Sequence, residues 1–172
     1  MPSAAIDPIV MAARFIVDVQ SVVSREKDAG AFGVITIGAI EGGSAGNIIP
    51  DHVNLRGTIR SYSPAVREVL HGGIRRTAAA VAAMAGAPAP VVQIGTGSSA
   101  VVNDTVLAER TGVVFKAAFG DKATRDEEPG SASEDYSVFI QAGIPSVYFN
   151  IRGADPVKLA EAKAKGIEAP SN

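Results

Sequence analysis

Two amphipathic segments, each introduced by an N-cap residue and a proline, enclose two β-rich segments in the first hundred residues of the chain. Asp7-Pro8 begins the first helix, because aspartate supplies a capping oxygen and proline is tolerated at the first helical position. Ser63-Pro64 repeats this signature and begins a longer helix that Gly86 ends. Helical spacing predicts one buried stripe for each helix: Ile9, Ala12, Ala13, Ile16, Gln20 and Val23 in the first, and Val66, Leu70, Ile74, Thr77, Val81 and Met84 in the second.

The segments between and after these helices are short and rich in β-branched residues, which favours strands. Residues 31–40 predict a first strand, and residues 53–60 alternate with period two and predict a second, half-buried strand. A glycine-rich turn joins the two, and residues 91–95 predict a third strand. The order helix, strand, strand, helix, strand becomes the split β-α-β arrangement of a ferredoxin-like domain if one further strand precedes Met1.

The chain beyond residue 100 has predicted helices but only one convincing strand, so it is typical of part of a larger α/β layer rather than of a closed domain. Its predicted elements are a helix capped by Asn103-Asp104 with a stripe of Val106, Arg110, Val113 and Ala117, a short helix opened by the Ser131 and Glu134 capping box, a strand over 146–151, and a last helix from Asp155-Pro156 to Gly166. We therefore expect two domains, 7–100 and 101–172.

Composition excludes several classes of function. The 172 residues include no cysteine, which rules out disulfides, thiolate zinc sites and cysteine nucleophiles, and only two histidines, His52 and His71. Neither histidine has a metal-ligand partner at suitable spacing on its own element, so we expect this chain alone to hold no catalytic residue and no metal ion. A net charge of −2 argues against a nucleic-acid partner. No membrane-spanning segment or signal peptide is recognisable, so cytoplasmic localisation is the default expectation.

Three polar residues are candidates for substrate binding, and each has a structural alternative. Asn47 ends the glycine-rich turn, and Arg60 offers a rigid two-pronged donor for a carboxylate. From spacing alone, turn capping by Asn47 and a surface ion pair for Arg60 are the favoured interpretations. Glu134 at a helix start either satisfies the positive end of the helix dipole or places a carboxylate in a cleft.

Five segments, taken together and in order, resemble the metal-dependent aminoacylase and carboxypeptidase family, in particular its amidohydrolase branch of hippurate hydrolases and indole-acetyl-amino-acid hydrolases. They are Asp7-Pro8-Ile9, the GSAGNIIPD stretch at 43–51, the RGTIR stretch at 56–60, Val102-Asn103-Asp104 and the SEDYSVF stretch at 133–139. The resemblance implies an α+β chain. Residues 7–100 would be a ferredoxin-like lid, or dimerisation, domain with an antiparallel sheet and two helices, and residues 101–172 the C-terminal part of a zinc-exopeptidase-like α/β catalytic domain.

The resemblance also implies a chemistry: the full-length enzyme cleaves the amide of a hippurate-like N-acyl amino acid, with two divalent metal ions (zinc or manganese) activating a water. It assigns Asn47 and Arg60 to lid positions that grip the substrate carboxylate, often in the partner subunit's site, and Glu134 to an acid that lines the active site. The family's metal-ligand motifs would precede Met1 and follow Asn172, so we expect an inactive fragment. Ser3 stands where many relatives carry a second histidine.

Two functions without catalysis are alternatives to this one. The first is a ferredoxin-like dimerisation module that forms a homodimer through its sheet edges and helices. The second is an RNA-binding ferredoxin-like domain, which needs exposed aromatic residues on its strands to stack bases. Residues 34–40 and 53–60 contain no aromatic residue, which disfavours the RNA-binding function.

Overall fold

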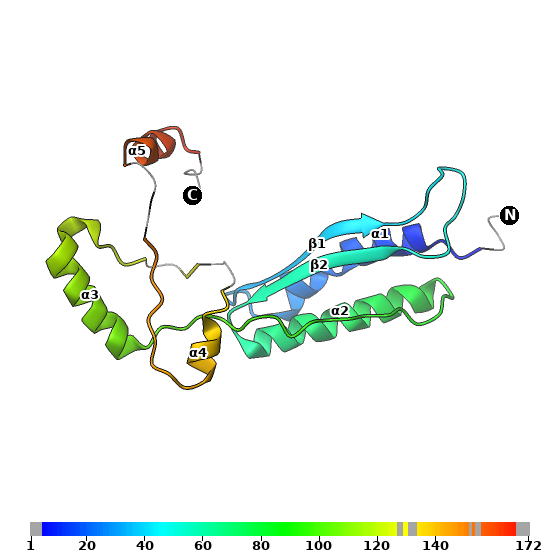
Figure 1. Ribbon diagram of the computed structural model, residues 1–172. Coiled ribbons are helices and arrows are strands. Elements are labelled where there is room, and N and C mark those ends of the chain that lie inside the picture. The colour runs from blue at the N-terminus through cyan, green and yellow to red at the C-terminus, as the bar shows by residue number, and fades with distance from the viewer. Residues whose placement is uncertain (1–4, 127–128, 131–133, 152, 154–155, 168–172) are drawn as a thin grey trace. The chain divides into compact units, whose positions relative to one another are not determined.

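The computed structural model describes residues 5–126, 129–130, 134–151, 153 and 156–167. The chain divides into two compact units. The first consists of Met1–Ala100 with Glu127–Val138, and the second of Val101–Asp126 with Phe139–Asn172. The first unit contains the hairpin and the helices α1 and α2 that lie along it in Figure 1, and it carries the site described below.

As far as residue 84, the first unit follows the predicted order of elements. Its elements are α1 (Pro8–Asp18), the π-helical turn η2 (Val22–Glu26), β1 (Gly33–Glu41), β2 (Asn54–Ser61) and α2 (Pro64–Met84). The Asp7 side chain accepts hydrogen bonds from the backbone N–H groups of Ile9 and Val10 at 2.9 and 3.3 Å, which confirms the predicted cap. Both predicted helix starts at proline are therefore confirmed, although the Ser63 side chain makes no capping hydrogen bond.

The two strands form an antiparallel hairpin whose register runs from Gly33 opposite Ser61 to Glu41 opposite Asn54. The register shifts once, between Ile37 and Ala39. Near this shift the strands approach closely at Gly57, where an added Cβ would lie 2.2 Å from the carbonyl oxygen of Thr36. Glycine at this position is therefore required by the close approach of the strands, and not only by the alternation of the sequence.

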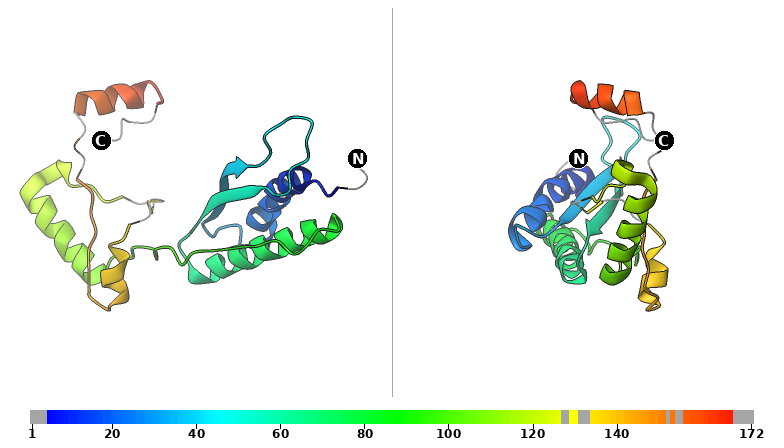
Figure 2. Two further views of the ribbon diagram at one scale, coloured as in Figure 1. Left: turned by 45° about the vertical axis from the view of Figure 1, so that its right-hand side comes forward. Right: turned by 90° about the vertical axis from the view of Figure 1, so that its left-hand side faces the viewer.

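Both helices pack on one face of the hairpin, as the two views in Figure 2 show. The buried centre of this layer is formed by Val19, Val22, Ile35 and Leu70. Leu70 and the rest of the predicted α2 stripe are buried or half-buried, apart from Met84, which is exposed. The stripe predicted for α1 is partly wrong, because Ile9, Ala13 and Gln20 are exposed. Ala12, Val19 and Val22 are buried and Phe15 is half-buried, since the turn into η2 shifts which side of the helix faces the sheet.

The predicted third strand is wrong, because residues 87–104 form neither helix nor strand. Exposure along 91–95 nevertheless alternates with period two, with Val92 and Ile94 half-buried. A strand exists only through hydrogen bonds to a neighbouring strand. No backbone–backbone hydrogen bond joins residues 90–98 to another described residue, so this extended segment lacks the partner that would make it a strand.

The second unit holds the remaining helices: α3 (Thr105–Phe119), η3 (Gly120–Lys122), the end of α4 (Ser137–Gln141) and α5 (Pro156–Ala164). The predicted cap Asp104 is confirmed, since its side chain accepts from the Leu107 N–H at 2.8 Å. The predicted α3 stripe is wrong, because Val106 and Val113 are exposed while Leu107 and Phe115 are half-buried. The Ser131 capping box and the residues Asp155 and Asn172 lie outside the described residues.

The strand predicted over 146–151 is also not formed. Two links tie this segment to the residues before α3: the Asp104 N–H donates to the Ser146 carbonyl at 2.9 Å, and the Asn103 amide bonds both the N–H and the carbonyl of Tyr148 at 2.7 and 3.0 Å. These contacts hold the segment extended but give it no continuous neighbour, so it does not become a strand.

Candidate functional site

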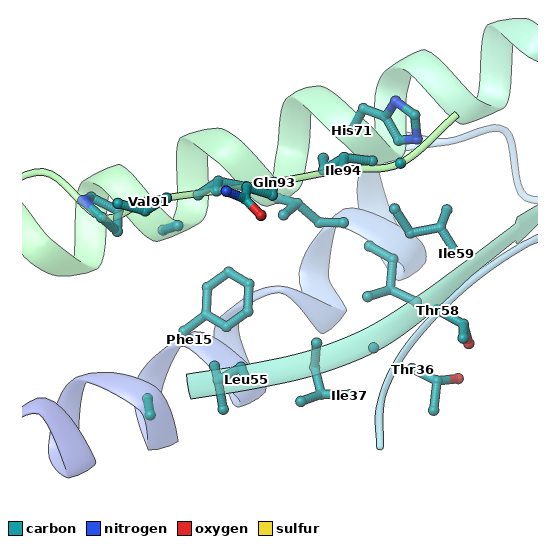
Figure 3. A pocket seen from close by; sticks show the side chains of 18 of the residues that line it. Phe15, Thr36, Ile37, Leu55, Thr58, Ile59, His71, Val91, Gln93 and Ile94 are labelled. Atoms are coloured by element: carbon teal, nitrogen blue, oxygen red, sulfur yellow. The ribbon is translucent and has the colours of Figure 1, made fainter. Parts of the chain in front are cut away.

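A groove of about 570 Å³ runs through the first unit between β2 and the extended segment 90–98. Figure 3 shows Phe15, Ile37, Leu55 and Ile59 facing this space, with Gln93 pointing toward it from the opposite wall. The floor is apolar because it is made of the inner face of the hairpin and of the facing sides of α1 and α2. Its volume falls in the range of about 300–1,000 Å³ that is usual for binding sites.

Polar side chains stand at one end of the groove. The guanidinium of Arg67, on the first turn of α2, donates to the carbonyl oxygens of Thr96 and Ser98 at 3.3 and 2.8 Å. His71 lies one turn further along α2, with its Nδ1 3.9 Å from the Glu68 carboxylate. These bonds attach the end of the extended segment to the helix, so the wall of the groove is fixed in place.

Arg60 and Asn47 lie at opposite ends of the hairpin. Arg60 is exposed near the end of β2 and lines the groove, while Asn47 is exposed in the loop 42–53 that projects beyond the other end in Figure 1. Arg60 lies six residue steps after Asn54 along β2, which corresponds to about 20 Å at about 3.4 Å per residue. One chain therefore does not bring these two predicted substrate-binding residues together.

Glu134 belongs to the segment 127–138 that packs with the first unit. It is half-buried just before α4, and its backbone carbonyl accepts from the Ser137 hydroxyl at 3.4 Å. The Tyr62 hydroxyl donates to the carbonyl oxygens of Pro129 and Gly130 at 3.0 and 3.3 Å. This bond attaches the segment next to Glu134 to the end of the hairpin that carries Arg60.

The two histidines are far apart in the fold and each has a single acidic neighbour. His52 Nδ1 lies 2.6 Å from Asp51 Oδ1, where the hydrogen bond from the histidine side chain, and secondly its charge, lower the pKa of the Asp51 carboxyl. Among the described residues, no three histidine or carboxylate side chains gather closely enough to hold a metal ion. The described residues therefore do not fit a catalytic metal centre.

Sequence patterns did not connect Arg67, His71 and Gln93 with a common groove, because the groove exists only after α2 folds back along the hairpin. One signal could have found it. A strand predicted at 91–95, with a missing neighbour between it and the strand at 53–60, implies an open slot at that place in the sheet.

Residues 1–83 match the family model of the peptidase dimerisation domain, M20_dimer. The chain is 35% identical to N-acetyldiaminopimelate deacetylase of Leuconostoc citreum, over 93% of this chain and 41% of the relative. It spans about two fifths of the length of the curated relatives that it matches first, 38% and 41%.

Two solved structures share the fold. A putative aminohydrolase from methicillin-resistant Staphylococcus aureus superimposes with a TM-score of 0.70 and 28% identity, covering 84% of this chain and 36% of that one. A Bacillus subtilis protein described as a dinuclear metal binding peptidase from the M20 family gives a TM-score of 0.56 and 25% identity, covering 81% of this chain and 35% of that one. Within the described residues, none of the helices has the length and apolar character needed to cross a bilayer.

Proposed function

Because this chain belongs to the metal-dependent aminoacylase and carboxypeptidase family, M20, we propose that it is part of an amidohydrolase that cleaves the amide of an N-acyl amino acid. The observation that carries the proposal is the peptidase dimerisation domain matched over residues 1–83, whose helices and hairpin form the first unit. The name of the deacetylase relative supports an N-acyl substrate, and hippurate is the aromatic probe that the resemblance suggests.

The catalytic metals of such an enzyme would be held by residues outside those described here, since these include no suitable cluster. When bound, two divalent ions would supply an activated water for attack on the amide carbonyl. The residues of this chain would bind and orient the substrate: a guanidinium and an amide recognise a carboxylate by charge-assisted hydrogen bonds. We therefore expect the isolated chain to hydrolyse neither hippurate nor N-acetyl amino acids.

The separation of Asn47 and Arg60 favours a homodimer. A single amino-acid carboxylate cannot contact residues at both ends of a hairpin whose strand β2 extends about 20 Å from Asn54 to Arg60. Two copies of the chain, related by a two-fold axis, can present Asn47 of one subunit and Arg60 of the other to the same substrate. We propose that each active site is completed in this way through the dimerisation domain.

The full-length enzyme tests this arrangement by complementation. Asn47→Ala and Arg60→Ala should each raise KM for hippurate or an N-acetyl amino acid more than they lower kcat. Unfolding and reassembling the two variants together should restore about a quarter of the sites, because half of the dimers are mixed and one site in each mixed dimer keeps both residues. No recovery, with mixed dimers present by mass spectrometry, would show that both residues act within one subunit or that neither binds substrate.

A dimerisation module without catalysis is the second candidate, favoured by the description of the matched domain and by the lack of a metal cluster among the described residues. Sedimentation of the isolated chain, combined with assays of the full-length protein, separates the two functions. The dimerisation module is supported if the full-length protein forms dimers but hydrolyses no N-acyl amino acid in the presence of zinc or of manganese. Cytoplasmic localisation stays a prediction from the sequence.

A further inference from the structure

Tyr62 directly follows β2, and its ring is held at the end of the hairpin. The register pairs Gly33 with Ser61, so Phe32 and Tyr62 flank the last pair of the two strands. Side chains at such opposed positions lie close enough to interact. The two rings stack, with centroids 4.3 Å apart and an interplanar angle of 21°. This stack fixes the direction in which the tyrosine hydroxyl points.

The backbone on both sides of Tyr62 is also restricted. The strand ends at Ser61, and Ser63 precedes Pro64, where a residue is confined to the extended region. Ser63 has this conformation, with φ −105° and ψ 134°. Its carbonyl accepts from the Arg67 N–H at 3.0 Å in the first turn of α2. Because the strand before Tyr62 and the helix after it hold the backbone, the side chain can act as a rigid support.

The hydroxyl of Tyr62 contacts a segment that is far away in the sequence. It donates to the carbonyl oxygens of Pro129 and Gly130 at 3.0 and 3.3 Å, across 67 and 68 residues of the chain. Proline has no N–H and glycine has no side chain, so the carbonyl groups are the main polar groups that this dipeptide offers. The tyrosine hydroxyl therefore attaches the dipeptide through the groups best suited to hold it.

This attachment lies between two of the predicted substrate-binding residues. Arg60 precedes Tyr62 by two residues, and Glu134 follows Gly130 by four. Glu134 is half-buried, and Ser137 of the same segment is buried. Four residues reach at most about 14 Å when they are fully extended. The contact at Gly130 therefore limits how far Glu134 can move from the end of the hairpin that carries Arg60.

We propose that Tyr62 is a positioning residue of the active site. Its hydroxyl holds the segment that leads to Glu134 against the end of the hairpin that carries Arg60. This inference rests on the proposed function, since it requires that Arg60 binds the substrate carboxylate. Without the hydroxyl, the segment would move relative to Arg60, and a substrate held by its carboxylate would no longer be aligned with the acid.

Tyr62→Phe in the full-length enzyme removes the donor and keeps the ring. Loss of one neutral hydrogen bond changes an equilibrium by about three- to tenfold, and we expect kcat/KM for hippurate or an N-acetyl amino acid to fall by that factor. Ser21→Ala is the matched control. The exposed Ser21 hydroxyl also donates to a backbone carbonyl, but to that of nearby Asp18, at 2.6 Å. Its loss should change kcat/KM by less than about twofold.

Two readouts separate positioning from a general loss of structure. In the Arg60→Ala background, Tyr62→Phe should lower kcat/KM by less than about twofold, because the carboxylate is no longer held and the place of Glu134 relative to it matters less. A general loss of structure would lower kcat/KM by the same factor in both backgrounds. Hydrogen exchange at the backbone amides of 134–138 should be faster in Tyr62→Phe than in the parent enzyme, with exchange in 54–61 unchanged.

An enzyme that hydrolyses N-acyl amino acids and is unaffected by Tyr62→Phe overturns this inference and leaves the proposed function intact. The same holds if Tyr62→Phe acts equally in both backgrounds, if exchange in 134–138 is unchanged, or if exchange in 54–61 becomes faster as well. A parent enzyme that hydrolyses no N-acyl amino acid, with zinc or with manganese, overturns the proposed function and this inference together. A loss confined to the parent background, with faster exchange in 134–138 alone, supports the role of Tyr62.

Discussion

The two adjacent glycines of α2 should respond in opposite ways to replacement by alanine. In a helix interior glycine is about 1 kcal/mol less favourable than alanine. From the sequence alone, Gly72→Ala and Gly73→Ala are therefore both expected to raise the free energy of unfolding. Their surroundings differ. A Cβ added at Gly72 meets no atom within 4 Å, whereas one at Gly73 would lie 2.3 and 2.7 Å from the two γ-carbons of Val22.

The size of the Gly73→Ala effect on stability depends on whether the Val22 side chain can move away from the added methyl group. Val22 is fully buried and β-branched, so it cannot rotate away from a new methyl group without displacing its neighbours. Overpacking of this kind costs about 1–3 kcal/mol, and the contact below 2.5 Å places Gly73→Ala near the upper end of that range. Subtracting the gain of about 1 kcal/mol in helix propensity leaves a net destabilisation of about 1–2 kcal/mol. Gly72→Ala should stabilise the chain by about 1 kcal/mol.

Urea unfolding followed by helical circular dichroism measures both changes. A double-mutant cycle with Val22→Ala isolates the contact: Gly73→Ala should cost less in the Val22→Ala background, by about 1 kcal/mol or more, because the clashing γ-carbons are gone. If Gly73→Ala is as stabilising as Gly72→Ala, then α2 and η2 do not approach as closely as the structure has them, and the reasoning fails.

Two further measurements test the core and the loop. Leu70→Ala removes a fully buried side chain at the centre of the first unit and should lower the free energy of unfolding by about 2–5 kcal/mol, whereas Val69→Ala, at a side chain 37% exposed, should cost less than about 1 kcal/mol in the same urea assay. The Asp51 carboxyl should titrate below its ordinary pKa of 3.8 by NMR and return toward that value in His52→Ala but not in His71→Ala. Because the folded pKa is lowered, any stability from this pair is present above the unfolded pKa and is lost as pH falls through the folded one. An Asp51 titration that His52→Ala leaves unchanged would contradict the assigned cause.

The helices of the first unit could be predicted because their signals are local. Asp7-Pro8 and Ser63-Pro64 fix where α1 and α2 begin, and a helix satisfies its backbone within its own length. The buried face of α1 could not be predicted as well, since it depends on the turn into η2 and on how that turn meets the sheet. The pairing of β1 with β2 was predictable because the single loop 42–53 joins them, so each strand finds its neighbour nearby in the sequence.

The candidate site, too, could be predicted from the sequence only in its local features. The sequence around Asn47 and the sequence around Arg60 each point to a single residue, and neither says how far apart a hairpin places the two. The distance follows only from the register, which puts Asn54 at one end of the sheet and Ser61 at the other. A clamp for a carboxylate built from both residues is therefore a hypothesis about two subunits, which no single-chain pattern could have stated.

Both strand predictions that failed concern segments without a continuous neighbour. Residues 91–95 keep the alternating exposure of a strand, and residues 146–151 keep two anchoring links, yet neither forms a ladder. Intrinsic β-propensity describes how well a residue fits a half-buried pleated surface, and it cannot supply the hydrogen bonds of an adjacent strand. The failure at 91–95 therefore marks a place in the sheet where a strand fits but none of the described residues lies.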